Sequence, residues 1–228
     1  MSPSRRNLIL RFSIFYLLFS ILNTVSLQTL IFKQFGKPSG FLGRIVGYIL
    51  ANRPSNIERG EWTISLLNLQ PTDRVLETGY GSGLTIEKMS KQVTAGQIVG
   101  IDYSDVMYKV AGKRNRQAIA AGRVKLYLGP AHELPPEAGQ FDKIVDTNCF
   151  KFWDHKVAAL IILRARLNPG GMIALTDQPR HKGATNQDAK ATAEKYANYL
   201  KEAGFTNIRT EYKQMLPVSA ICVMGERE

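Results

Sequence analysis

The chain has 228 residues, which is enough for one well-buried domain and an extension but too few for two full enzyme domains. Hydrophobic residues make up 44% of the chain and charged residues 21%, proportions that exclude a disordered or fibrous protein. The two cysteines, Cys149 and Cys222, form no metal-binding or disulfide pattern, so we expect a reduced, intracellular domain without a bound metal.

The net charge of +11 is concentrated at the N-terminus. Residues 1–57 hold seven of the thirty basic residues and no acidic residue, which leaves 23 basic against 19 acidic residues beyond them. The remaining chain is therefore only mildly basic, which argues against a large nucleic-acid-binding surface there. The basic N-terminal part would suit a membrane surface as well as a phosphate backbone.

Residues 1–32 form a hydrophobic N-terminal segment. No charged residue occurs from Phe12 to Phe32, a stretch close to the roughly 20 residues that span a bilayer core. Polar residues dilute its second half and weaken the span. Three interpretations stay open: a spanning or interfacial membrane anchor over 12–32, a signal peptide, and a dispensable extension.

Residues 33–70 are interpreted as a helical lead-in. Apolar positions recur from Phe41 to Leu50, and a polar break follows at 52–55. A second helix is predicted near 58–69. We therefore expect N-terminal helices before the main domain.

From residue 71 onward, short apolar runs alternate with longer helical patterns, an order typical of a parallel α/β sheet. Parallel strands are predicted over 74–78, 97–102, 124–128, 143–147 and 172–176. Helices are predicted over 84–93, 104–121 and 156–167, with turns at 71–73, 121–122 and 169–171. A last helix near 187–203 precedes two apolar runs, 207–212 and 218–224, which should form an antiparallel hairpin.

The clearest chemical signal is a strand that runs into three alternating glycines. Glu77 ends the apolar part of this strand, and Gly79, Gly81 and Gly83 follow it before the next helix. Glycines allow a tight turn and a close backbone approach to a ligand, and the helix N-terminus offers free backbone donors. Leu84 stands where a dinucleotide fingerprint has its last glycine, which disfavours NAD. A merely tight strand-to-helix turn is the alternative.

An acidic residue, Asp102, ends the following strand, nineteen residues after Gly83. In a doubly wound sheet this carboxylate lies beside the glycine loop and can accept hydrogen bonds from both hydroxyls of a ribose. Asp102 would also suit as a cap for the helix that begins near Ser104, and both roles can hold together. Tyr103 is expected to pack on an adenine ring or to be an ordinary half-buried aromatic residue.

With these motifs the chain resembles the class I S-adenosylmethionine-dependent methyltransferases, in particular the small-molecule branch called methyltransferase type 11. The resemblance runs from about Phe41 to the C-terminus and rests on 77–83, Asp102, 129–135, 141–145 and 167–171. It implies an α/β fold with a doubly wound, mostly parallel seven-stranded sheet and an antiparallel last strand. It also implies S-adenosylmethionine as the cofactor of residues 71–228, with the glycine loop at its methionine part and Asp102 at its ribose.

One position departs from this family. An acidic residue usually follows Gly129 and accepts a hydrogen bond from the adenine amine. This chain has Pro130 there, which offers neither a side-chain acceptor nor a backbone donor. Adenine recognition would then fall to the Ala131 amide, to His132 or to water, although His132 is equally well interpreted as an exposed loop residue.

The residues after the fourth strand are candidates for the acceptor site, because ligands bind at the carboxyl ends of parallel strands. Asn148, Cys149, Phe150 and Trp153 lie there, and the two aromatic residues would serve equally well in helix packing. Methyl transfer needs alignment and exclusion of water more than a strong base, so we assign no catalytic residue. The candidate bases are His155 and His181.

The leading functional hypothesis is methyl transfer to a small molecule, and to a lipophilic one if the N-terminal segment is an anchor. The catalytic domain would then be cytoplasmic, because a secreted protein has no supply of the cofactor. Nucleic-acid methylation is disfavoured by the charge balance and by the lack of an Asn-Pro-Pro-Tyr-like run after the fourth strand. A membrane-tethered cofactor-binding module without turnover is the alternative from another class.

Overall fold

The computed structural model of the chain describes residues 53–228. The hydrophobic segment 1–32 and most of the helical lead-in lie outside the described residues, so the interpretations of both stay predictions. Within residues 53–228, no helix combines the length and the apolar character needed to cross a membrane.

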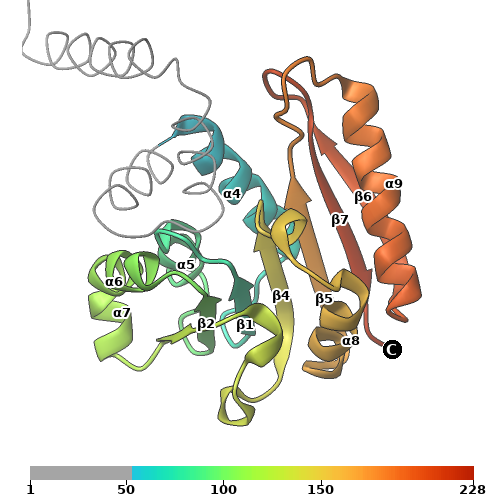
Figure 1. Cartoon of the computed structure of the whole chain (residues 1–228). Helices are drawn as coiled ribbons and strands as arrows, with labels where there is room; N and C mark the ends of the chain where they lie inside the picture. Colours follow the sequence, from blue (N-terminus) through green and yellow to red (C-terminus); the bar gives the residue numbers. More distant parts are fainter. Residues whose placement is uncertain (1–52) are drawn as a thin grey trace, which may run out of the picture.

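A seven-stranded sheet forms the centre of the described chain, in the order β3-β2-β1-β4-β5-β7-β6 (Figure 1). The strands are β1 Arg74–Thr78, β2 Gln97–Asp102, β3 Val124–Leu128, β4 Phe141–Thr147, β5 Leu167–Asp177, β6 Thr206–Lys213 and β7 Ala220–Glu226. Strands β1 to β5 pair in parallel, whereas β7 runs antiparallel to both β5 and β6. The predicted sheet, its antiparallel last strand and the predicted hairpin are all confirmed.

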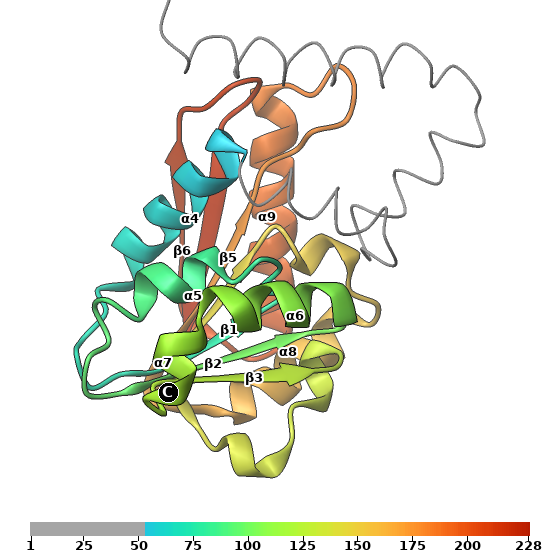
Figure 2. The same ribbon diagram turned by 90° about the vertical axis from the view of Figure 1, so that its left-hand side faces the viewer.

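Helices cover both faces of the sheet (Figure 2), as the fold class requires. They are α4 Pro54–Leu67, α5 Leu84–Met89, α6 Asp105–Arg114, α7 Arg116–Ala120, α8 Lys156–Ala165 and α9 Asn186–Glu202. Helices α4 to α7 pack on one face, and α8 and α9 pack on the other. Successive strand residues therefore enter opposite cores: Val75 lies in the core beneath α4 to α7, and Leu76 in the core beneath α8 and α9.

Three of the predicted helices differ clearly in extent from those in the structure, and one of them, predicted over 84–93, ends at Met89 as α5. The helix predicted over 104–121 is divided at Asn115 into α6 and α7. The side-chain amide of Asn115 donates to the carbonyl oxygens of Ala111 and Gly83, each at 3.0 Å, and so ties the division to the glycine loop. Helix α4 begins earlier than predicted, because Pro54 occupies its first turn, where no backbone N–H is required.

The prediction of a turn at 169–171 is wrong, because these residues belong to β5. Gly170 has a φ of 75° and donates its N–H to the Arg227 carbonyl at 2.7 Å, while the Arg227 N–H donates to the Gly171 carbonyl at 2.8 Å. The pairing of β4 with β5 shifts register in this part of the strand. A Pro-Gly-Gly run therefore marks an irregularity inside a strand here, which glycine permits as readily as a turn.

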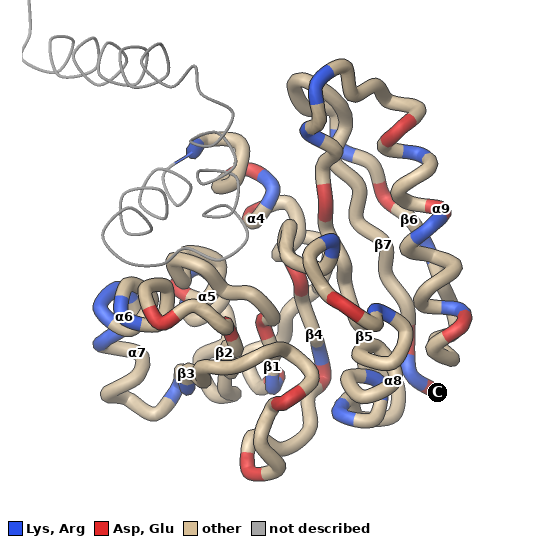
Figure 3. The backbone as a smooth tube through the Cα atoms, in the orientation of Figure 1, with Lys and Arg blue, Asp and Glu red and all other residues tan. Residues whose placement is uncertain are grey.

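The carboxyl ends of the parallel strands meet at one edge of the sheet, where four buried acidic residues lie. Glu77 and Asp146 lie one residue before the ends of β1 and β4, and Asp102 and Asp177 end β2 and β5. Charged residues of both signs are spread over the surrounding helices (Figure 3). Buried carboxylates need hydrogen-bond donors, so their partners define the candidate site.

Candidate active site

The glycine loop between β1 and α5 has two tightly packed glycines, Gly79 and Gly83, and one open glycine, Gly81; a Cβ atom on Gly83 would stand 2.5 Å from the Asn115 side chain. Gly79 and Gly81 both have positive φ angles, of 68° and 49°. A Cβ atom on Gly79 would stand 2.2 Å from the Sγ atom of Cys149, so packing also demands glycine there. A Cβ atom on Gly81 would meet nothing within 4 Å. The Gly81 backbone therefore faces open space that a ligand can enter.

The Asp102 carboxylate ties the glycine loop to the end of β2. Its Oδ2 atom accepts a hydrogen bond from the Gly81 N–H at 2.8 Å, and its Oδ1 atom accepts one from the Ser104 N–H at 2.9 Å. Burial raises the pKa of Asp102, and these two donors partly oppose that shift. The cap of α6 is Ser104, whose hydroxyl accepts from the Met107 N–H at 3.3 Å. Asp102 is therefore not the side-chain cap of this helix.

Glu77 lies almost fully buried beneath the same loop, with 2% of its surface exposed. The carboxylate accepts hydrogen bonds from the Thr85 side chain and the Ile86 backbone. Its Oε2 atom has no partner among the described residues. Burial, with Asp146 and Asp102 nearby, raises the pKa of Glu77 well above its usual range. A buried carboxylate oxygen without a hydrogen-bond donor is a candidate partner for a ligand that brings an N–H or O–H group.

The residues predicted to contact adenine lie around the ends of β2 and β3. Tyr103 is half-buried, and burial raises its pKa to about 12. Ala131 begins a short 3-10 helix, Ala131–Glu133, and packs against the core. The His132 side chain is 47% exposed and lies 3.8 Å from the Glu133 carboxylate. The Gly129 N–H donates to the Asp102 carbonyl at 2.9 Å, which brings this loop to the end of β2. Their contacts with adenine stay predictions.

The predicted acceptor residues after β4 occupy different environments. Asn148 has a φ of 65°, and its N–H donates to the Thr176 carbonyl at 2.8 Å. Phe150 is 1% exposed and makes edge-to-face contacts with Trp153 and Tyr196, at ring distances of 5.1 and 4.8 Å. These contacts favour a packing role for Phe150, the alternative that the sequence left open.

Asp146 connects the glycine-loop strand with the loop after β4. Its Oδ1 atom accepts from the N–H groups of Cys149 and Phe150 at 2.9 and 2.8 Å, and its Oδ2 atom accepts from the Thr78 hydroxyl at 3.0 Å. The side chain is fully buried, and burial raises the pKa of Asp146 to about 7. Thr78 immediately precedes Gly79, so this carboxylate holds both loops in one hydrogen-bonded unit.

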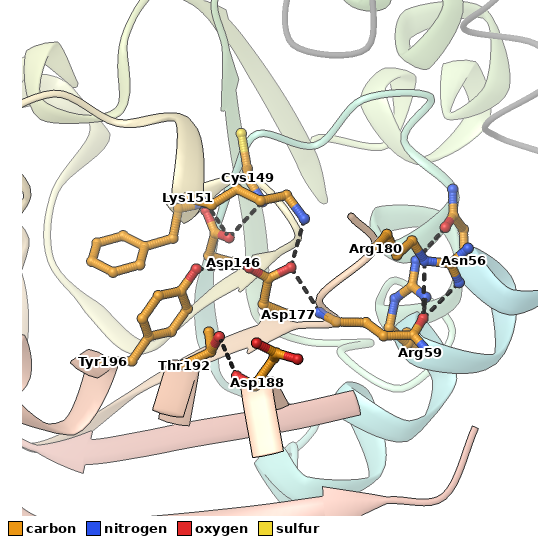
Figure 4. Close-up of polar contacts among 12 residues, drawn as sticks. Asn56, Arg59, Asp146, Cys149, Lys151, Asp177, Arg180, Asp188, Thr192 and Tyr196 are labelled. Atoms are coloured by element: carbon orange, nitrogen blue, oxygen red, sulfur yellow. Dashed lines mark hydrogen bonds and ion pairs between the residues drawn. The ribbon is translucent and has the colours of Figure 1, made fainter. Parts of the chain in front are cut away.

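A cleft of about 620 Å³ lies next to this unit, between the loops after β4 and β5 and the N-terminal half of α9. At its inner end the Asp177 carboxylate accepts from the Lys151 ammonium at 2.6 Å, the Gln178 N–H at 2.7 Å and the Tyr196 hydroxyl at 2.8 Å (Figure 4). Lys151, Asp177 and Tyr196 are not among the residues predicted from the sequence. An acid at the end of the fifth strand was the available signal, the same one that identified Asp102.

Comparison with known proteins identifies the family. A methyltransferase domain family matches residues 75–171. The uncharacterized methyltransferase YdaC of Bacillus subtilis is 30% identical over 183 residues, which cover 80% of this chain and 98% of that protein. The chain belongs to the class I S-adenosylmethionine-dependent methyltransferases.

Two further similarities concern the fold and a shared segment. The N-methyltransferase NodS of Bradyrhizobium japonicum, solved with S-adenosyl-L-homocysteine, has a TM-score of 0.63 at 17% identity, over 78% of this chain and 90% of that one. A ubiquinone/menaquinone biosynthesis C-methyltransferase, UbiE, of Pseudomonas putida is 30% identical over 117 residues. Those residues cover 51% of this methyltransferase and 46% of UbiE, so the match spans about half the length of that relative.

Of the two candidate bases in this methyltransferase, only His181 lines the cleft. Its side chain is 61% exposed, and its Nε2 atom lies 3.8 Å from the Asp188 carboxylate. His155 precedes α8 with a φ of 45° and lines a separate hollow together with Lys156 and Tyr199. Within residues 53–228, no group of three His, Cys, Asp or Glu residues is arranged to hold a metal ion.

Proposed function

We propose that this methyltransferase transfers the methyl group of S-adenosylmethionine to a small molecule bound in the cleft beside Asp177. The main support for this proposal is that the parts of the candidate site are neighbours in the structure. The open face of Gly81, the Asp146 carboxylate and the Asp177 cleft follow one another along the carboxyl edge of the sheet. Ligands of open α/β sheets bind at this edge.

Three residues of the glycine-loop region would hold the cofactor. Asp102 has lone pairs left for ribose hydroxyls, Gly81 offers an open backbone face, and the orphaned Oε2 atom of Glu77 can accept from an amine. When bound, S-adenosylmethionine supplies a methyl group made electrophilic by its sulfonium. Adenine would lie towards Tyr103 and the Ala131–His132 segment, because Pro130 provides no polar side chain.

The protein's part in the transfer is alignment and exclusion of water. Asp146 and Asp177 each already accept three hydrogen bonds, so they stiffen the walls rather than remove a proton from the acceptor. His181 is the cleft residue that can take up a proton if the acceptor atom carries one. An acceptor that is deprotonated at neutral pH would need no such base.

The size of the cleft supports a small acceptor, since ligand pockets commonly have volumes of about 300–1,000 Å³. The similarity to a quinone-biosynthesis enzyme supports an acceptor with an apolar part, as does the uncharged stretch 12–32 if it anchors the chain. Basic and acidic residues alternate along α9 beside the cleft, which argues against a nucleic-acid-binding stripe there (Figure 3).

The test is incubation of the purified full chain with methyl-labelled S-adenosylmethionine and fractionated cell extract. We expect the label in a small molecule, with formation of S-adenosylhomocysteine. Asp102→Ala should abolish the transfer, whereas Asp105→Ala, an exposed position at the start of α6, should not. Label in nucleic acid would contradict the small-molecule acceptor. Tight cofactor binding without any labelled product would favour the cofactor-binding module.

A further inference from the structure

Two arginine side chains meet on one neutral amide oxygen at the edge of the cleft. Arg180, in the loop after β5, donates from Nε and Nη2 to the Gln178 Oε1 atom at 3.0 and 2.6 Å. Arg59, on α4, donates from Nη1 to the same oxygen (Figure 4). Two guanidinium groups that share a single acceptor repel each other, so the arrangement is costly unless an anion joins it.

The described residues supply no carboxylate partner for either arginine. Arg59 also donates to the Asn56 Oδ1 atom, and Arg180 to the Ser55 hydroxyl at 2.9 Å, and both of these acceptors are neutral. Arg59 is 2% exposed, and its Nε atom is buried without a partner among residues 53–228. Burial and the neighbouring Arg180 lower the pKa of Arg59 to about 10. A buried cation with an orphaned donor indicates a missing acceptor.

Neither Gln178 nor Asp177 gives the two arginines a negatively charged hydrogen-bond acceptor. The Gln178 side-chain NH2 group donates to the Leu216 and Val218 carbonyls, which fixes its oxygen towards the two arginines. Asp177 attracts both arginines electrostatically, but its hydrogen bonds are with Lys151, the Gln178 N–H and Tyr196. The pair of arginines is therefore preorganised, and no carboxylate of residues 53–228 is hydrogen-bonded to either of them.

The cleft next to Arg180 is also lined by more basic than acidic side chains. Its lining includes Lys151, Lys156 and Lys195 as well as Arg180, against two carboxylates, Asp177 and Asp188. Both carboxylates are engaged: Asp188 accepts from the Thr185 N–H and hydroxyl, each at 2.7 Å, in the capping box of α9. Phe152 and Tyr196 give the same cleft an aromatic wall.

We propose that the methyl acceptor carries an oxyanion, a carboxylate or a phosphate, which binds to Arg180 with Arg59 behind it. The less polar part of this acceptor lies along the wall that Phe152 and Tyr196 form in the cleft. A planar guanidinium binds either group through paired hydrogen bonds, which are stronger when both partners are charged. This inference deepens the proposed function, and rests on it in taking the cleft as the acceptor site.

The test compares matched probes on the full chain by titration calorimetry: phenylacetate, phenyl phosphate and the neutral phenylacetamide. We expect at least one of the two anions to bind about tenfold more tightly than the amide. Arg180→Gln should raise the dissociation constant of that anion by about tenfold, and Arg180→Lys by less. Arg116→Gln, at an exposed position on α7, should leave it unchanged. The stronger anion distinguishes a carboxylate site from a phosphate site.

Two results would overturn the inference. One is equal binding, or no binding, of the three probes to the wild-type chain. The other is unchanged anion binding in Arg180→Gln when its melting curve shows that the variant is folded. Because these titrations do not measure methyl transfer, they fail separately from the proposed function. A labelled product without an acidic group would likewise refute the oxyanion while leaving the methyltransferase activity established.

Discussion

Replacing Gly81 with alanine should separate cofactor binding from folding. The added methyl group meets no atom within 4 Å, so the chain can accommodate it. It would, however, project into the space that the glycine loop leaves open for the cofactor. We therefore expect Gly81→Ala to fold and to lose most of its affinity for S-adenosylmethionine.

The stability cost of this change comes from the backbone alone. Gly81 has a φ of 49°, and a left-handed conformation costs an alanine about 1–2 kcal/mol. For a domain of this size that cost corresponds to a fall in melting temperature of roughly 2–8 °C. Gly122→Ala is the matched control, because Gly122 has a φ of 72°, also faces open space and lies in the turn before β3.

Gly79→Ala should behave differently. Its methyl group would stand 2.2 Å from the Sγ atom and 2.5 Å from the Cβ atom of Cys149, so overpacking adds about 1–3 kcal/mol to the backbone cost. Combining it with Cys149→Gly removes both clashing atoms and leaves the Cα atom at 4.0 Å. The double variant should therefore be more stable than the sum of the two single changes implies.

Melting curves without cofactor and calorimetric titration with S-adenosylmethionine measure the two effects independently. Gly81→Ala and Gly122→Ala should melt at similar temperatures, and only Gly81→Ala should bind the cofactor about tenfold or more weakly. If Gly81→Ala bound the cofactor as well as the Gly122 control, the loop would not approach the ligand. If Gly79→Ala were as stable as Gly122→Ala, the packing of this glycine against Cys149 would be wrong.

Three further predictions follow from the buried carboxylates. Asp102→Asn should lower both cofactor affinity and the melting temperature of the free protein, because a carboxylate that accepts from the Gly81 and Ser104 N–H groups is lost. An unchanged melting temperature would show that these hydrogen bonds do not hold the glycine loop to the end of β2. The pKa of Asp146 is about 7 in the folded chain and 3.8 in the reference state, so its contribution to stability is present below pH 3.8 and is lost as pH rises towards 7. Urea unfolding should therefore show wild type losing stability relative to Asp146→Asn between about pH 4 and about pH 7, by up to about 1.4 kcal/mol per pH unit, and parallel pH profiles would contradict this. Tyr196→Phe removes one of three donors to Asp177 and should destabilise the chain by about 1–3 kcal/mol, whereas Tyr212→Phe, at an exposed position, should be neutral in the same unfolding measurement.

The sheet could be predicted from the sequence because its strands are short apolar runs between clear turn residues. Strands β1, β2 and β3 have the predicted bounds, and burial of successive residues in two different cores explains why the central strands β1 and β2 are mostly apolar. The division at Asn115 could not be predicted, because it depends on a hydrogen bond to Gly83, 32 residues away. The course of 169–171 was missed because Pro-Gly-Gly is typical of turns and of irregular strands alike.

The glycine loop and Asp102 were easier to predict from the sequence than the residues of the cleft, for a physical reason. The glycine loop and Asp102 are local motifs, whose spacing alone places them at one sheet edge. The arginine pair forms only in three dimensions, since Arg59 and Gln178 are 119 positions apart in the chain. Nothing around Arg59 in the sequence distinguishes it from the exposed basic residues that helices commonly carry.

Position alone does not distinguish the three aspartates at the strand ends as candidate ribose ligands, but the number of hydrogen bonds that each receives within the chain favours one of them. A carboxylate has about four acceptor sites. Among the described residues, Asp146 and Asp177 each receive three hydrogen bonds, whereas Asp102 receives two. Two acceptor sites therefore remain on Asp102, the number that two ribose hydroxyls would require, which supports Asp102 as the ribose ligand in the proposed function.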